Sequence, residues 1–187
     1  GELRRAIAEH ELVLHYQPKL DLRSKLIDRV EALVRWQHPR DGLLLPAHFI
    51  PLAEQTGLIK PLTLYVLETA LAQCKRWLDA GRSIGISVNI SPRNLNDSDF
   101  PGDVEELLRR YDVPAEHLLL EVTERGIIAD PARAEATLRR LSELGVRIAL
   151  DDFGAGHSSL AFLARLPLDQ IKIDRSFVTD LVTDSGE

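Results

Sequence analysis

The sequence predicts an α/β protein in which helices wrap a mostly parallel sheet that closes into a barrel with an antiparallel first strand. Strand-like and helix-like segments alternate from residue 84 to residue 174, which is typical of parallel sheets with helical connections. A short polar link near the start leaves no room for a helix between the first two strands. Polar side chains recur at the ends of separate strands. In a barrel these ends form a ring at one mouth, whereas an open sheet spreads them along a line.

The first two strands are predicted over Leu12–Leu22 and Leu26–Trp36, which are rich in leucine, valine and isoleucine. We expect the first strand to break at Pro18, because proline donates no backbone hydrogen bond. Only residues 21–25 separate the two strands, and a parallel crossover needs about a dozen residues or more. The chain is therefore expected to begin with an antiparallel hairpin.

Two helices are expected next, a short one over Pro46–Glu54 and a long one over Lys60–Ala80 that ends at Gly81. A later helix starts at Pro131, with Asp130 as its N-cap and Gly145 as its stop. The remaining elements alternate between strand and helix over Ile84–Ile90, Asp103–Tyr111, Leu118–Thr123, Arg147–Asp152, Ser159–Arg165 and Gln170–Asp174.

Length and composition indicate one globular domain with an acidic balance. The chain has 187 residues, of which 44% are hydrophobic, enough for a sizeable core. Its net charge of -6 argues against a nucleic-acid polymer as partner. Cys74 is the single cysteine, which excludes a disulfide framework and fits a reducing compartment. No stretch is apolar enough to span a bilayer, so we expect no membrane contact by this segment and a cytoplasmic location, free or within a larger membrane-anchored protein.

Residues 1–11 are predicted to form a connecting helix, because Leu3 and Ile7 have helical spacing. Such a helix implies an upstream module. The domain proper is expected over residues 12–187.

The stretch RIALDDFGAGHSSL, residues 147–160, carries the most unusual pattern in the chain. An apolar run delivers the adjacent acids Asp151 and Asp152 into a glycine-containing loop. Two neighbouring carboxylates repel each other unless a cation or a proton compensates them. The loop imitates the dinucleotide-binding pattern G-x-G-x-x-G, but Ser159 replaces the third glycine and the acids would repel a pyrophosphate.

The polar residues of the predicted strand ends form a hard, oxygen-rich set: Glu31, Asn89, Glu121, Glu124, Asp151 and Asp152. Such ligands suit Mg²⁺ or Mn²⁺ better than zinc or copper. Two ions about 4 Å apart, bridged by a carboxylate such as Asp151, activate a water and stabilise both reacting oxygens of a phosphodiester. Lys172 is expected to hold or to deprotonate that water, and Arg35 to clamp a phosphate oxygen.

Each of these residues also has a simpler explanation. Lys172 would form an ion pair with Asp174 or with an acid of a neighbouring strand. Asn89 would cap a turn, and Arg35 would stack on Trp36. Only the joint pattern favours a functional site.

The chain resembles the EAL domain family of cyclic di-GMP phosphodiesterases. The motifs that carry the resemblance occur in order along the chain: YQPKLDL, EALVRWQHPRDGLLLPAHFIPLAEQTGLI, SVNISPRNL, LEVTE, DDFGAGHSSL and QIKID. The resemblance implies a TIM-like (βα)8 barrel with an antiparallel first strand. It also implies a two-metal site with Mg²⁺ or Mn²⁺, and hydrolysis of cyclic di-GMP to linear pGpG in bacterial signalling.

The resemblance also implies a role for each matching residue. The metal ligands would be Glu31, Asn89, Glu121, Asp151 and Asp152. Lys172 would lie at the nucleophilic water and act in catalysis with Glu31 and Asp151. Gln17 and Arg35 would bind substrate, and Glu124 would anchor the DDFGAGHSSL loop, which links the metal site to a homodimer contact. Within that loop, Ala155 and His157 replace the common threonine and tyrosine.

Two family motifs, AEGVE and QGY, have no counterpart before Glu187, so we expect the last two βα units to be missing from this chain and its own activity to be poor. The predicted function is metal-dependent hydrolysis of cyclic di-GMP, with an upstream sensor or GGDEF module. The alternative is a non-catalytic cyclic di-GMP receptor that regulates a partner.

Overall fold

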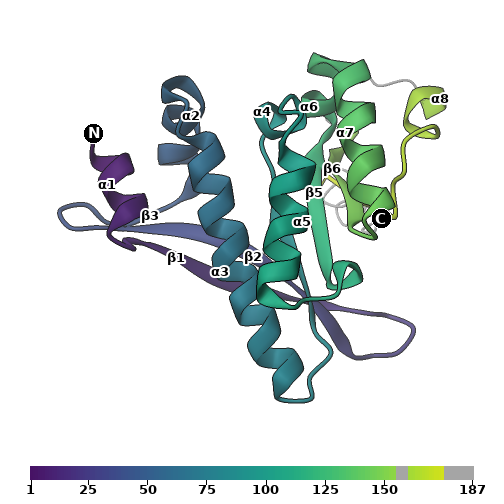
Figure 1. Cartoon of the computed structure of the whole chain (residues 1–187), viewed down its shortest axis with the longest axis horizontal. Coiled ribbons are helices and arrows are strands. Elements are labelled where there is room, and N and C mark those ends of the chain that lie inside the picture. The colour runs from purple at the N-terminus through teal and green to yellow at the C-terminus, as the bar shows by residue number, and fades with distance from the viewer. Residues whose placement is uncertain (155–159, 175–187) are drawn as a thin grey trace, which may run out of the picture.

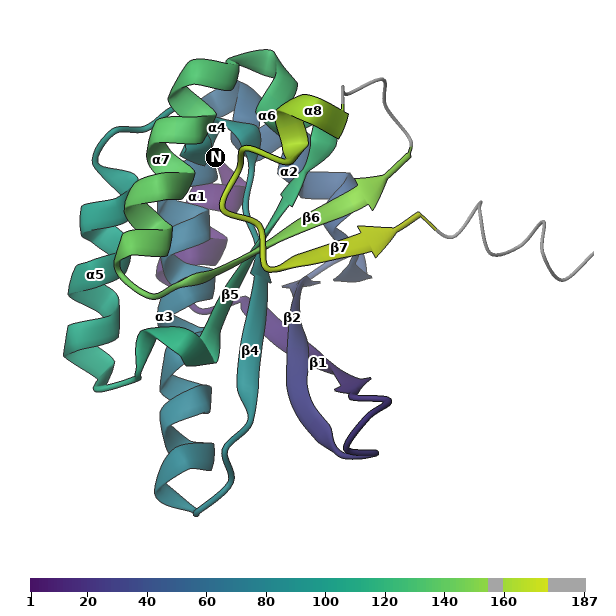
Figure 2. The same cartoon turned by 90° about the vertical axis from the view of Figure 1, so that its right-hand side faces the viewer.

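A twisted sheet with helices packed on one face organises the chain (Figures 1 and 2). The computed structural model describes residues 1–154 and 160–174. The strand order is β1-β2-β4-β5-β6-β7, and β3 pairs with β2 outside this path. β1 is antiparallel to β2, and every later neighbour along the path is parallel. The parallel sheet and its antiparallel start confirm the predicted topology. Within the described residues, β1 and β7 are the two ends of the path.

The strands are β1 (Leu12–Leu20), β2 (Ile27–His38), β3 (Gly42–Leu44), β4 (Gly85–Asn89), β5 (Leu118–Thr123), β6 (Arg147–Phe153) and β7 (Gln170–Ile173). The helices are α1 (Glu2–Ala8), α2 (Pro46–Thr56), α3 (Ile59–Asp79), α4 (Pro92–Leu95), α5 (Phe100–Tyr111), α6 (Glu124–Ala129), α7 (Pro131–Glu143) and α8 (Leu160–Leu163), with a 3₁₀ turn at Ala115–His117.

The predicted break of the first strand at Pro18 is wrong. β1 continues through Pro18, which lies opposite Val30 in the antiparallel register. Because β1 has a single strand partner in the described part of the chain, alternate N–H groups face away from β2. A proline is tolerated at such an edge position, since no ladder hydrogen bond is lost.

Short elements at the strand ends were not predicted, namely β3, α4 and α6. Both helices are too short to show an apolar repeat in the sequence, and each begins with a side-chain hydroxyl cap. Ser91 Oγ accepts a hydrogen bond from the Arg93 N–H, and Thr123 Oγ1 accepts one from the Gly126 N–H. The predicted cap of α7 is confirmed, because Asp130 Oδ1 accepts a hydrogen bond from the N–H of Arg133, the third residue of the helix.

Two apolar clusters form the core. The larger lies between the sheet and helices α3, α5 and α7, and includes Leu71, Phe100 and Leu120, all fully buried. The smaller joins α1, α2 and the start of α3 to β2, where Leu3 packs in the same cluster as Trp36. The N-terminal helix is thus anchored on the elements that follow it, while the boundary after residue 11 stays a prediction. In the described parts, no helix is both long and apolar enough to cross a bilayer.

Candidate functional site

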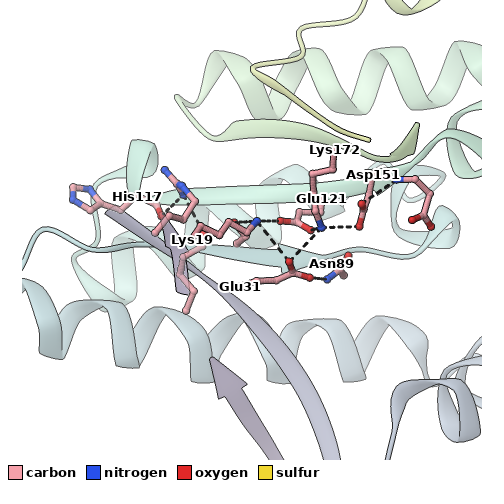
Figure 3. A network of polar contacts seen from close by, with 11 residues as sticks. Lys19, Glu31, Asn89, His117, Glu121, Asp151 and Lys172 are labelled. Atoms are coloured by element: carbon pink, nitrogen blue, oxygen red, sulfur yellow. Dashed lines mark hydrogen bonds and ion pairs between the residues drawn. The ribbon is translucent and has the colours of Figure 1, made fainter. Parts of the chain in front are cut away.

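Five strands bring polar side chains together on the face of the sheet that the helices leave uncovered (Figure 3). β2 supplies Glu31, β4 Asn89, β5 Glu121, β6 Asp151 and β7 Lys172. Successive side chains along a strand point to opposite faces, so one polar residue per strand is enough to build a shared cluster. Asn89 and Glu121 are register partners across β4 and β5. The side chains therefore meet near the carboxyl ends of the parallel strands, as predicted.

Lys172 is the cation on which the acids converge. Its ammonium nitrogen lies 3.2 Å from Glu31 Oε2, 2.5 Å from Glu121 Oε2 and 2.9 Å from Asp151 Oδ2. Burial opposes its positive charge, but hydrogen bonds to Glu121 and Asp151 outweigh burial and raise the pKa of Lys172. The simpler explanation, an ion pair with an acid of a neighbouring strand, is met by Asp151 of β6, and Lys172 also pairs with acids of two more distant strands.

Lys19 is a second cation of the cluster, and the sequence reasoning missed it. Its ammonium group contacts Glu121 Oε1, lies 3.1 Å from Ser87 Oγ and 3.6 Å from Glu31 Oε2. The signal was present in the alternation of β1, where Lys19 is two residues from Gln17 and therefore shares its face. Its relation to the acids depends on the hairpin register, which the sequence alone does not define.

The surroundings of Glu31 favour its ionised form. Asn89 Nδ2 donates a hydrogen bond of 2.9 Å to Glu31 Oε1. Burial by itself would raise the pKa of Glu31, but this hydrogen bond and the two ammonium groups lower it below its ordinary value. Glu121 is the most enclosed member, with a side chain that is 0% exposed. These two carboxylates are the charged centre of the cluster.

Asp152 has a different environment from Asp151. The pairing of β6 and β7 shifts register between Leu150 and Phe153, and Asp152 adopts the left-handed φ of 53°. Its N–H donates to Asp151 Oδ1 at 2.9 Å. Burial, Asp151 and Asp174 raise the pKa of Asp152. The irregular strand end thus holds two like charges side by side.

Glu124 begins α6 and is buried, with 3% of its surface exposed. The Gly154 N–H donates to Glu124 Oε2 at 3.4 Å, so Glu124 contacts the start of the loop that follows β6. Residues 155–159 of that loop, including Ala155 and His157, lie outside the described residues.

The two predicted substrate-binding residues, Gln17 and Arg35, lie beside the cluster but make no described contact with its carboxylates. Gln17 is exposed and directly opposite Glu31 in the register of β1 and β2. Arg35 is four residues beyond Glu31 on the same face, and its guanidinium donates to the Val34 carbonyl. Trp36, next in the strand, is buried against Phe49 on the other face, which argues against stacking with Arg35.

A cavity of about 310 Å³ lies next to Asn89, on the helix side of β2 and β4. Its lining is mostly apolar and includes Leu33 and Pro46. Its polar groups include Glu54 and Ser91, which are joined by a hydrogen bond of 2.6 Å. Asn89 belongs to both features, because it lines the cavity and donates a hydrogen bond to Glu31 of the carboxylate cluster.

The donor chemistry fits a hard divalent cation, because carboxylate and amide oxygens are the ligands such ions prefer. Within the described ranges, no three acidic, histidine or cysteine side chains are already arranged around a single ion position. Instead, the ammonium groups of Lys19 and Lys172 lie between the carboxylates. The convergence of three acids on Lys172 shows that the cluster is built to surround positive charge.

Comparison with known proteins gives a consistent family assignment. The sequence profile described as "EAL domain" matches residues 1–187. The chain is 43% identical over 187 residues to the bifunctional diguanylate cyclase/cyclic di-GMP phosphodiesterase MucR of Pseudomonas aeruginosa. This alignment covers 100% of the chain but only 27% of MucR. The chain is 40% identical to the cyclic di-GMP phosphodiesterase PdeR of Escherichia coli, covering 96% of this chain and 27% of PdeR. The chain thus spans about a quarter of these relatives.

Comparison with solved structures supports the same family assignment. A cyclic di-GMP complex of the PaMucR phosphodiesterase superposes with a TM-score of 0.92 at 43% identity, covering 98% of this chain and 75% of that one. The FimX EAL domain of Xanthomonas citri in complex with cyclic di-GMP gives a TM-score of 0.87 at 27% identity, covering 100% and 72%. The predicted TIM-like α/β fold is confirmed by this likeness. EAL phosphodiesterases generally depend on a divalent metal, and the chain belongs to the EAL domain family.

Proposed function

We propose that this chain is part of the catalytic domain of a phosphodiesterase that hydrolyses cyclic di-GMP to linear pGpG with Mg²⁺ or Mn²⁺. The observation that carries the proposal is the convergence of Glu31, Glu121 and Asp151, from three strands, within 3.2 Å of one cationic atom. Relatives at about 40% identity that are named cyclic di-GMP phosphodiesterases support the substrate.

The proposed metal ligands are the oxygen donors of the cluster: Glu31, Asn89, Glu121, Asp151 and Asp152. Bound divalent metal, as one ion or a pair, supplies an activated water and offsets the charge of the phosphate. For Asn89 to offer its amide oxygen, its side chain must turn from its present role as hydrogen-bond donor to Glu31.

Lys172 is proposed to orient the water or the phosphate rather than to accept a proton. Its contacts with acidic side chains raise the pKa of Lys172, which favours the ammonium form. An ammonium group has three donors and no acceptor, which suits it to holding an oxygen. Of the two roles considered for Lys172, this favours positioning over general-base catalysis.

Gln17 and Arg35 are proposed to contact the substrate. Both lie on the same face of the hairpin as Glu31, and within the described residues neither contacts the carboxylates of the cluster. A guanidinium matches two phosphate oxygens at once, so Arg35 is suited to clamp one phosphodiester group while the other reacts. Glu124 is proposed to anchor the loop after β6 through its contact with Gly154.

The function is tested by incubating protein that carries this chain with cyclic di-GMP and either Mg²⁺, Mn²⁺ or EDTA. We expect pGpG to accumulate with metal and not with EDTA. Binding of cyclic di-GMP without product at saturating metal would instead support the alternative, a non-catalytic receptor. Absence of both binding and turnover would reject both functions.

A homodimer, an upstream sensor or GGDEF module and a cytoplasmic location are part of the same proposal. The family's dimer contact involves the loop at residues 155–159, outside the described residues. Light scattering of the purified protein tests the dimer directly: a mass of one chain at micromolar concentration would contradict it.

A further inference from the structure

We infer that Lys19 is an internal counter-cation of the carboxylate cluster and lowers the affinity of that cluster for divalent metal. The inference rests on the proposed function, since it assumes that the metal binds at Glu31 and Glu121. It assigns a role to Lys19, which is not among the site residues expected from the sequence.

The contacts of Lys19 place its charge between the two central ligands. Its ammonium nitrogen pairs with Glu121 Oε1 and lies 3.6 Å from Glu31 Oε2 (Figure 3). Lys172 pairs with the other oxygen of Glu121, at 2.5 Å. Each oxygen of this fully buried carboxylate is therefore already in contact with a positive charge. A divalent ion that approaches the same oxygens meets an ammonium group in its coordination space.

Lys19 is held where it is by its surroundings. Its ammonium group also donates to Ser87 Oγ at 3.1 Å, so β4 fixes its position as well as β5. Its strand is paired with β2 along most of its length. Arg29, its partner in the register, is 6% exposed and donates to the carbonyls of Ile86 and His117. The residue opposite Lys19 in the sheet is therefore fixed to the backbone of β4 and of the 3₁₀ turn.

Two effects of Lys19 on metal binding oppose each other. As a donor it holds Glu121 in place, which favours binding; as a charge it repels a divalent ion, which disfavours it. Glu121 does not depend on Lys19 for its position, because its side chain is enclosed and Lys172 holds its other oxygen. Unit charges at about 4 Å interact strongly even in a partly screened site. Repulsion therefore outweighs orientation.

The test is a calorimetric titration of the full chain with Mn²⁺. The variants are Lys19→Met, which removes the charge and keeps an unbranched side chain, and Lys19→Arg, which keeps the charge. Lys75→Met is the matched control, because Lys75 also bridges two acids, Asp79 and Asp112, on the outer surface. We expect Lys19→Met to bind Mn²⁺ about tenfold more tightly, and the other two to stay within about twofold of the parent.

Weaker or unchanged Mn²⁺ binding by Lys19→Met, in protein whose circular dichroism matches the parent, would overturn the inference. Weaker binding would identify Lys19 as a residue that orients Glu121. Tighter binding by Lys75→Met to the same extent would overturn it too, because net charge alone would then explain the effect. If neither the parent nor Lys19→Met binds Mn²⁺ at millimolar concentration, the proposed metal site itself fails.

Discussion

Asp151 and Asp152 are neighbours in sequence but have opposite effects on the fold. Asp151 pairs with Lys172 at 2.9 Å, whereas the surroundings of Asp152 raise its pKa. A carboxyl group whose pKa is raised on folding costs stability once it ionises. The cost is absent below its ordinary pKa of 3.8 and is complete when the pH has risen past the raised value. At neutral pH Asp152 therefore destabilises the chain unless a cation compensates.

Asp152→Asn is expected to raise the melting temperature in EDTA at pH 7 by roughly 1–3 °C, because it removes an exposed like charge worth less than about 1 kcal/mol. Asparagine also tolerates the left-handed φ of 53° at this position. Asp151→Asn is the control, and it should lower the melting temperature, since it breaks the contact with Lys172. If both variants shift in the same direction, the two acids do not differ as argued.

Most site residues were predictable because their side chains follow a simple rule. Glu31, Glu121 and Asp151 are acids within otherwise apolar strands, and strand alternation places them on one face. Lys19 was not predictable in the same way, since a lysine in an amphipathic edge strand is ordinarily a solvated residue. Its role depends on the register of the β1–β2 pair, which is set in three dimensions.

At the scale of elements, the pairing of β2 with β4 positions Glu31 of the site. Gly85 lies opposite Arg29, and a Cβ at Gly85 would come within 2.8 Å of the guanidinium carbon. That guanidinium is buried and donates to the carbonyls of Ile86, Glu116 and His117. The glycine is thus required by the close approach of a side chain.

Gly85→Ala is expected to lower the free energy of unfolding by about 1–3 kcal/mol, because the guanidinium must move and leave carbonyl groups unpaired. Urea denaturation measures this change. In an Arg29→Ala background the same substitution should cost much less, since the space is then open. An equal cost in both backgrounds would show that contact with Arg29 is not the cause.

Long periodic elements were predictable from the sequence, and short ones at the strand ends were not. The apolar spacing of α3 and α7 predicted both helices to within a residue or two at the ends that were assigned. The continuation of β1 through Pro18 was not foreseen, because tolerance of proline depends on which edge of a strand faces a partner. The helix α6 depends on the hydroxyl cap of Thr123, and α4 on a capping box between Ser91 and Asn94, rather than on a long apolar pattern.

For the whole molecule, the cluster is a concentration of negative charge in a chain whose net charge is -6. Two ammonium groups offset part of the charge of four carboxylates: Glu31, Glu121, Asp151 and Asp152. Metal that binds the folded chain alone stabilises it by mass action. The stability of the fold is therefore expected to increase when divalent metal binds.

Mn²⁺ at about one hundred times its dissociation constant should stabilise the chain by about 2.7 kcal/mol, or roughly 5–10 °C for a domain of this size. Differential scanning fluorimetry with and without EDTA measures the shift. Glu31→Gln should reduce it strongly, because a central ligand loses its charge. A full shift in Glu31→Gln would place the metal elsewhere.

The most direct measurement is the release of pGpG from cyclic di-GMP by protein carrying this chain and by its Glu31→Gln variant, followed by chromatography at saturating Mg²⁺ or Mn²⁺. The account predicts metal-dependent product from the parent and a loss of roughly two orders of magnitude or more in the variant, with its fold intact. Undiminished turnover by Glu31→Gln would contradict the assignment of the strand-end carboxylates as the catalytic site.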